Sequence, residues 1–246
     1  MNSQTIDVTT RDGVADSYLT RPDNAPHPGV LLMIDAIGLR PQIHEMADRI
    51  AGQGYVVLAP NLFYRAGRAP LWETPNLANA EERNRFMQTL GPIVSALTPE
   101  AMTSDGGSYL DQLAEVSAGP VGITGYCMGG RQGWQIAASH SDRVAALGGF
   151  HTGQMVTDAD DSPHLRAPEV KATVYWGHAD NDHSMSPEQI AALNKAMDDA
   201  RVPYTTEVYT GAVHGYTMAD QGAYNEAAAE RHFEALFALL GRTLQS

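Results

Sequence analysis

A short apolar strand that passes through a glycine-rich turn into a helix is the feature that most constrains this chain. Residues 121–124 form the strand, and the turn that follows reads Gly125-Tyr126-Cys127-Met128-Gly129-Gly130. A nucleophile at the tip of such a turn needs small residues two positions before and after it, because strand and helix pack closely there. Gly125 and Gly129 meet this requirement. The pattern therefore predicts a nucleophile elbow with Cys127 at its tip.

The position of Cys127 has chemical consequences. At the N-terminus of a helix, unpaired N–H groups and the helix dipole favour a thiolate over a thiol. The same turn would direct the backbone N–H of Met128 toward a developing oxyanion. A lone cysteine is often only a small buried hydrophobic residue. The flanking glycines and the strand-to-helix context favour the catalytic interpretation over this one.

Length and composition fit one ordinary globular domain over residues 1–246. The chain is 43% hydrophobic and 18% charged, and its single cysteine excludes an internal disulfide framework. We expect a cytoplasmic protein without a membrane partner, since no leader-like segment and no run of about 18 apolar residues is found. A net charge of −13 argues against binding to nucleic acid or to an anionic membrane surface.

The hydrophobic pattern alternates between strands and helices. Two alternating segments, 6–10 and 15–20, surround Arg11-Asp12-Gly13 and predict an antiparallel hairpin. A helical excursion is expected at about 65–119, with pieces at 80–90, 99–103 and 108–116. The remaining expected strands are 30–34, 55–60, 144–150, 172–177 and 204–209, and the later helices are 187–200 and 225–240. This order predicts an α/β-hydrolase fold, with a doubly wound, mostly parallel sheet and an N-terminal antiparallel hairpin.

Catalytic candidates follow the expected strands, because open parallel sheets collect their chemistry at the carboxyl ends of the strands. His214 follows the last strand and lies between small residues, which suits a general base. Asp180 follows the strand 172–177 and would orient that histidine. Cys127, Asp180 and His214 then stand in the chain order of α/β-hydrolases. Asp182, in the same loop, is the alternative acid.

Two other observations remain open at this level. The cluster His178, Asp180, Asp182 and His183 resembles a metal-binding run and would suit a metallohydrolase. That class needs further ligands and leaves the elbow unexplained, so we expect neither a metal nor an organic cofactor. His151 follows the strand 144–150 and could line a substrate pocket or cap the loop.

These residues together resemble the dienelactone hydrolases, which are cysteine-dependent α/β-hydrolases that open a lactone ring. The resemblance covers nearly the whole chain, and the cysteine elbow is its most specific part. The other matching segments are Asp12-Gly13, Pro28-Gly29-Val30, Gly54-Tyr55, Ala59-Pro60-Asn61-Leu62-Phe63-Tyr64-Arg65 and Ala212-Val213-His214-Gly215-Tyr216. By this resemblance, Cys127, Asp180 and His214 form the catalytic triad.

The resemblance also implies further site residues. Family members hold the resting thiol with a glutamate, and here that position is Asp35, which is one methylene shorter. The N–H of Ala36 would be the second oxyanion donor beside that of Met128. A family arginine that binds the substrate carboxylate is replaced by Met218.

A second family arginine could correspond to Arg83 or Arg85. Without the first one, the charge-assisted hydrogen bonds that select an acidic lactone are lost. The substrate could therefore be a neutral ester, lactone or thioester.

The expected activity is hydrolysis of a small-molecule ester or lactone through a thioester on Cys127. An esterase or thioesterase with a neutral substrate is the closest alternative. A non-catalytic hydrolase-like binding protein and a cysteine peptidase are further alternatives, although no feature of the sequence indicates an extended peptide groove. The sequence leaves the oligomeric state open.

Overall fold

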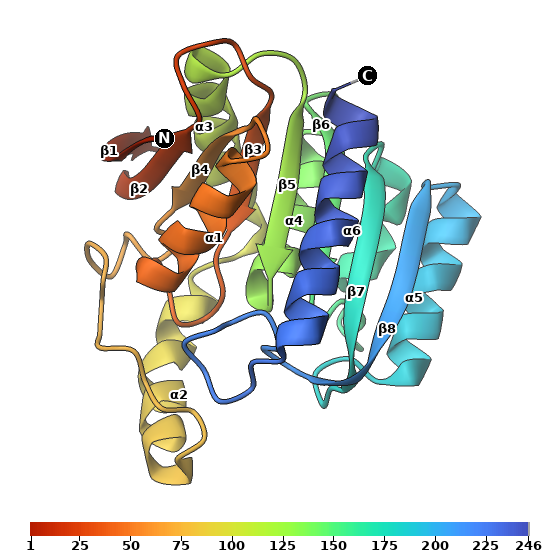
Figure 1. Cartoon of the computed structure of the whole chain (residues 1–246). Coiled ribbons are helices and arrows are strands. Elements are labelled where there is room, and N and C mark those ends of the chain that lie inside the picture. The colour runs from red at the N-terminus through yellow and green to blue at the C-terminus, as the bar shows by residue number, and fades with distance from the viewer. Residues whose placement is uncertain (246) are drawn as a thin grey trace.

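A mixed sheet of eight strands forms the centre of the molecule (Figure 1). The structure, a computed structural model, describes residues 1–245. The strand order is β1-β2-β4-β3-β5-β6-β7-β8; the pairs β1–β2 and β2–β4 are antiparallel, and all other pairs are parallel. The strands are β1 (Asn2–Thr10), β2 (Gly13–Arg21), β3 (Gly29–Met33), β4 (Val56–Pro60), β5 (Val121–Tyr126), β6 (Val144–Phe150), β7 (Thr173–Asn181) and β8 (Tyr204–Val213).

Helices cover both faces of this sheet. In Figure 1, α1 and α6 lie in front of it, and α3, α4 and α5 lie behind it. The strands β3, β4 and β5 between these layers are completely buried, which explains their unbroken apolar sequences. The helices are α1 (Pro41–Ala51), α2 (Ala80–Ser95), α3 (Pro99–Val116), α4 (Met128–Ser139), α5 (Pro187–Ala200) and α6 (Glu226–Leu244), with a 3-10 helix η1 (Pro163–Glu169).

The N-terminal hairpin has the predicted form. Thr10 pairs with Gly13 at its turn, and Gly13 has a φ of 152°. The second strand continues into the main sheet, where Ser17 lies opposite Pro60 of β4. The hairpin thus extends the parallel part of the sheet by two antiparallel strands at one edge.

The excursion between β4 and β5 differs from the sequence prediction in one respect. The two short helical pieces expected at 99–103 and 108–116 are one continuous helix, α3. A β-carbon on Gly106 would lie 2.6 Å from Cγ1 of Ile136 on α4, so the glycine permits close packing of these two helices. Gly106, which lies between the two predicted pieces, is therefore inside a helix that packs closely against α4.

The last strands are longer than the sequence indicated. β7 reaches Asn181 and β8 reaches Val213, four residues beyond the predicted ends in each case. Their pairing is irregular between Ala179 and Asn181. Both acidic candidates for the triad, Asp180 and Asp182, lie at or just beyond this irregularity. Within residues 1–245, no helix is both long and apolar enough to span a membrane.

Candidate active site

Cys127 occupies the tip of the turn between β5 and α4. Its φ is 55° and its ψ is −122°, a conformation that is uncommon for a residue with a side chain. A β-carbon on Gly125 would lie 2.4 Å from the carbonyl oxygen of Gly129, and one on Gly129 would lie 2.2 Å from that of Met33. The backbone is therefore close-packed on both sides of the cysteine, as the motif predicted.

Two backbone N–H groups are placed near the cysteine without protein acceptors. Met128 is the first residue of α4, so its N–H has no carbonyl one turn earlier in the helix. The N–H of Ala36 has no acceptor within residues 1–245, whereas the N–H of Ile37 donates to Oδ1 of Asp35 at 3.0 Å. Ala36 and Cys127 line the same cavity. Neither predicted oxyanion donor therefore has a protein acceptor within residues 1–245.

His214 lies on the loop after β8 and contacts a buried acid. Its Nδ1 is 2.7 Å from Oδ2 of Asp182, whose side chain is only 3% exposed. The N–H of Ser184 donates to Oδ1 of Asp182 at 2.8 Å, and its Oγ donates to the same oxygen at 2.5 Å. These contacts fix the carboxylate and occupy Nδ1 of His214. Nε2 is therefore the His214 nitrogen that remains for a hydrogen bond with Cys127.

The electrostatics of His214 favour its protonated form. Burial opposes the positive charge, but the negative charge of a Cys127 thiolate and the contact with Asp182 outweigh it and raise the pKa of His214 to about 10. Although burial acts in the other direction for Asp182, the hydrogen bond with His214 lowers the pKa of that carboxyl group. The arrangement therefore favours an imidazolium at His214 at neutral pH.

Asp180 does not occupy the position predicted for the triad acid. Its Oδ2 accepts a hydrogen bond from the N–H of Gly211 at 2.9 Å, and the residue is exposed. Within residues 1–245, it makes no hydrogen bond with His214. Because β7 continues past Ala179 with an irregular register, Asp180 still belongs to the strand edge and Asp182 is the first acid beyond it. The alternative acid of the sequence analysis is the one that contacts His214.

Asp35 does not hold the thiol as the resemblance implied. Its two carboxylate oxygens contact Nη1 and Nη2 of Arg40 at 2.7 and 3.0 Å. Arg40 also contacts Asp220 through Nε at 2.6 Å and through Nη2 at 3.1 Å. Within the described chain, no hydrogen bond joins Asp35 to Cys127. A buried ion pair thus replaces the expected contact, and Arg40 joins the loop after β3 to the loop after β8.

A cavity of about 370 Å³ lies over Cys127 and His214. Most of its remaining lining is apolar or small, and Met218 is part of it. Arg83 and Arg85 are exposed on α2 and do not line the cavity; Arg83 instead donates to the carbonyl oxygen of Leu77. The lining residues that sequence reasoning missed are Ile37, Leu77, Ala78, Gly215, Gln221, Gly222 and Ala223. Apart from Gly215, which belongs to a segment that carries the resemblance, they have neither charge nor a motif that would give a signal in the sequence.

His151 lines this cavity and contacts two residues of the loop after β8, Thr217 and His214. It is almost completely buried, its Nε2 is 2.7 Å from Oγ1 of Thr217, and its Nδ1 has no partner within residues 1–245. Its ring meets the ring of His214 edge to face at 5.2 Å between centroids. Burial, followed by the charge of His214, lowers the pKa of His151 well below its usual value. His151 therefore presents a neutral imidazole to the cavity.

The metal-binding alternative has no structural counterpart in the described residues. His178 is buried, whereas Asp180 and His183 are exposed. Within residues 1–245, no group of three or more histidine, cysteine, aspartate or glutamate side chains is arranged to bind a metal ion.

Comparison with known proteins identifies the family of this chain. The model of the "Dienelactone hydrolase family" matches residues 15–244. A "Putative carboxymethylenebutenolidase" of Escherichia coli K12 is 25% identical over 224 residues, covering 87% of this chain and 77% of that protein. A "Probable 2-oxo-3-(5-oxofuran-2-ylidene)propanoate lactonase" of Bradyrhizobium is 27% identical over 228 residues, covering 92% and 88%.

The fold also has solved counterparts. A "Putative Dienelactone Hydrolase" from Klebsiella pneumoniae superposes with a TM-score of 0.85 at 21% identity, covering 98% of each chain. At this identity the likeness concerns the fold. It includes the mostly parallel sheet and thus the frame on which the elbow is built.

Proposed function

Because the chain belongs to the dienelactone hydrolase family and is a carboxylic ester or lactone hydrolase, we propose that it acts through Cys127, His214 and Asp182. The observation that carries the proposal is the strained elbow cysteine beside a histidine whose Nδ1 contacts a buried carboxylate at 2.7 Å. Asp182 takes the role that the sequence had given to Asp180.

The proposed reaction has two half-reactions. Cys127 Sγ, as thiolate, bonds to the carbonyl carbon, while the N–H groups of Ala36 and Met128 stabilise the oxyanion. The bond to the leaving oxygen breaks, and that oxygen takes the proton from Nε2 of His214, which leaves a thioester on Cys127. Water then gives a proton to His214 and attacks the thioester carbon. The carbon–sulfur bond breaks, the carboxylic acid product is released, and the Cys127 thiolate is regenerated.

The cavity over Cys127 favours a substrate without a negative charge. Of its lining residues, Asp35 is already paired with Arg40, and no arginine or lysine is among them. A substrate carboxylate would lose its hydration there without gaining an arginine or lysine partner, and the buried Met218 offers only apolar contact. A neutral ester or lactone with a small apolar body fits this lining better.

The test compares a negatively charged substrate with two neutral ones. Wild-type protein is assayed with dienelactone, with its methyl ester and with phenyl acetate. We expect the neutral compounds to give the higher kcat/KM, because no arginine or lysine lines the cavity. Faster turnover of the free acid than of its methyl ester would contradict the proposed specificity.

The nucleophile is tested separately with Cys127→Ala. The variant should lose roughly a thousandfold or more of kcat/KM with its circular dichroism spectrum unchanged. If the wild type accumulates a thioester, detected by mass spectrometry after acid quench, the acyl group is attached to Cys127. Undiminished turnover by Cys127→Ala would refute the mechanism.

A further inference from the structure

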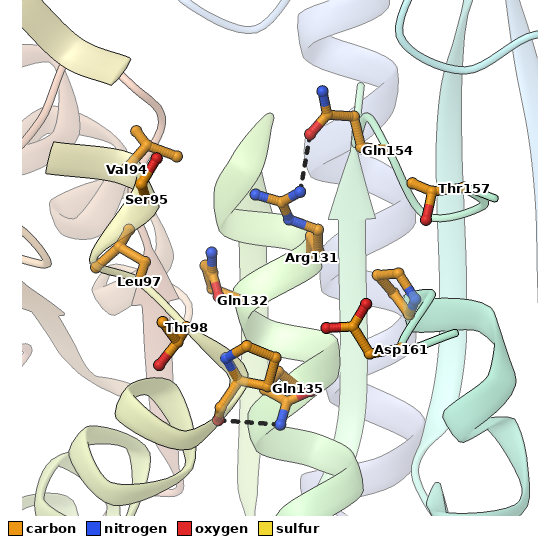
Figure 2. Close-up of a pocket in the computed structure, with 12 residues that line it drawn as sticks. Val94, Ser95, Leu97, Thr98, Arg131, Gln132, Gln135, Gln154, Thr157 and Asp161 are labelled. Carbon is orange, nitrogen blue, oxygen red and sulfur yellow. Dashed lines mark hydrogen bonds between the residues drawn. The ribbon is translucent and has the colours of Figure 1, made fainter. Parts of the chain in front are cut away.

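A second cavity, of about 410 Å³, lies beside α4 and shares no lining residue with the cavity over Cys127 (Figure 2). Its walls are the junction of α2 and α3 (residues 94–99), one side of α4, and the loop after β6 (residues 154–163). Its volume is within the usual range for sites that bind small molecules. Most of the residues that line it are polar, and nothing in the proposed reaction uses this cavity.

The positive charge in this cavity has no acidic partner. Arg131 donates from Nη1 to Oε1 of Gln154 at 2.8 Å, and Figure 2 shows the two side chains meeting at one end of the cavity. Within residues 1–245, no carboxylate lies within 4.0 Å of its guanidinium nitrogens. Arg40 and Arg65, in contrast, each contact two carboxylates. Arg131 is therefore a partly buried cation with only a neutral partner.

A second polar side chain faces the same space. Gln132 is only 3% exposed as a residue, its amide makes no hydrogen bond within the part of the chain that the structure describes, and its amide atoms are open to the cavity. The neighbouring Gln135 differs, because it donates to the carbonyl oxygen of Pro99 and to Oγ1 of Thr103. In Figure 2, the Gln132 amide lies at the cavity wall beside Arg131. An amide that opens onto the cavity without a protein partner can donate to, and accept from, a ligand or water there.

We propose that this second cavity binds a small carboxylate, with its oxygens on the Arg131 guanidinium and the Gln132 amide N–H. A guanidinium pairs with a carboxylate in a planar, charge-assisted arrangement that a neutral glutamine cannot replace. Asp161, on another wall of the cavity, disfavours a second negative group and can accept a hydrogen bond from a hydroxyl group. The class of ligand is thus a monoanionic hydroxy acid.

This chemistry has two possible sources. Opening a lactone ring yields a hydroxy acid, so the ligand could be a product of this protein, a source that rests on the proposed function. It could also be a hydroxy acid made by another enzyme. Binding at Arg131 does not depend on which source is correct, so it can be measured without turnover.

The test is calorimetric titration with sodium 4-hydroxybutyrate, with 4-hydroxybutyramide as the neutral match. Arg131→Gln should weaken binding of the acid by about tenfold or more, the cost of one charge-assisted contact, and should leave the amide unaffected. Arg242→Gln, which removes an exposed arginine of α6, is the matched control and should bind as the wild type does. Thr157→Trp fills the cavity without changing the charge and should also abolish binding.

Alkylation of the only cysteine distinguishes binding in the second cavity from binding in the cavity over Cys127. After iodoacetamide modifies Cys127, binding of 4-hydroxybutyrate should persist and should still require Arg131. Equal affinities of the wild type and Arg131→Gln would overturn the proposal, as would loss of binding on alkylation of Cys127. Hydrolysis with no Arg131-dependent binding removes this proposal alone, and Arg131-dependent binding with no hydrolysis removes the proposed function alone.

An inhibition assay distinguishes the sources. If 4-hydroxybutyrate inhibits hydrolysis in the wild type and not in Arg131→Gln, the site senses the protein's own product. Binding without inhibition indicates a hydroxy acid from elsewhere. Either result retains the carboxylate site.

Discussion

Replacement of Asp182 by asparagine tests the central contact of the proposed triad. The substitution keeps the shape of the side chain and removes the charge that His214 Nδ1 contacts at 2.7 Å. A hydrogen bond to a charged group contributes about 1.5–3 kcal/mol, which corresponds to a loss of roughly tenfold to a hundredfold in kcat/KM. The loss should appear mainly in kcat, because Asp182 does not line the cavity over Cys127.

Asp180→Asn is the matched control. Asp180 is exposed and has one hydrogen bond, from the N–H of Gly211 at 2.9 Å, so its loss should change activity by about twofold or less. Initial rates with phenyl acetate give kcat/KM for both variants, and urea unfolding checks that each remains folded. If Asp180→Asn loses as much activity as Asp182→Asn, or more, the assignment of Asp182 is refuted.

Two further predictions concern the elbow and the histidine. Gly129→Ala places a β-carbon 2.2 Å from the backbone oxygen of Met33 and should lower the free energy of unfolding by about 1–3 kcal/mol, whereas Gly91→Ala on α2 meets no atom within 4 Å and should be neutral or stabilising; urea unfolding that ranks them otherwise would contradict the close packing. The pKa of His214, raised from 6.5 to about 10, means that protonation of this residue stabilises the fold fully below pH 6.5 and that this contribution is lost as the pH rises toward 10. Cys127→Ala should lower this pKa, as followed by NMR of the histidine ring, and an unchanged value would show that the thiolate does not act on His214.

The sequence was most informative where the chemistry depends on local spacing. The elbow is specified by residues within a few positions of Cys127, and the structure places Gly125 and Gly129 against backbone atoms that leave no room for a side chain. The buried strands were equally visible, because strands covered on both faces are continuously apolar. These features belong to single elements, and a single stretch of sequence describes them.

Features that depend on two distant segments were not visible in the same way. Asp182 rather than Asp180 contacts His214, just beyond the point where the pairing of β7 with β8 becomes irregular. The partners of Arg40 are Asp35 and Asp220, and the second is 180 residues away in the chain. The break predicted near Gly106 is absent because contact with Ile136 holds α3 together with α4. Tertiary contacts decided each of these points.

The two ion pairs of Arg40 have a consequence for how the pocket accommodates different molecules. Asp35 belongs to the wall that carries the Ala36 donor, and Asp220 belongs to the wall that carries Met218. One rigid guanidinium thus acts as a spacer between the two walls, and widening the pocket would require breaking one of its two ion pairs. The pair with Asp35 is almost completely buried, whereas the side chain of Asp220 is 25% exposed. Substrates should therefore be sorted by thickness, with flat rings accepted and bulky tetrahedral groups next to the carbonyl excluded.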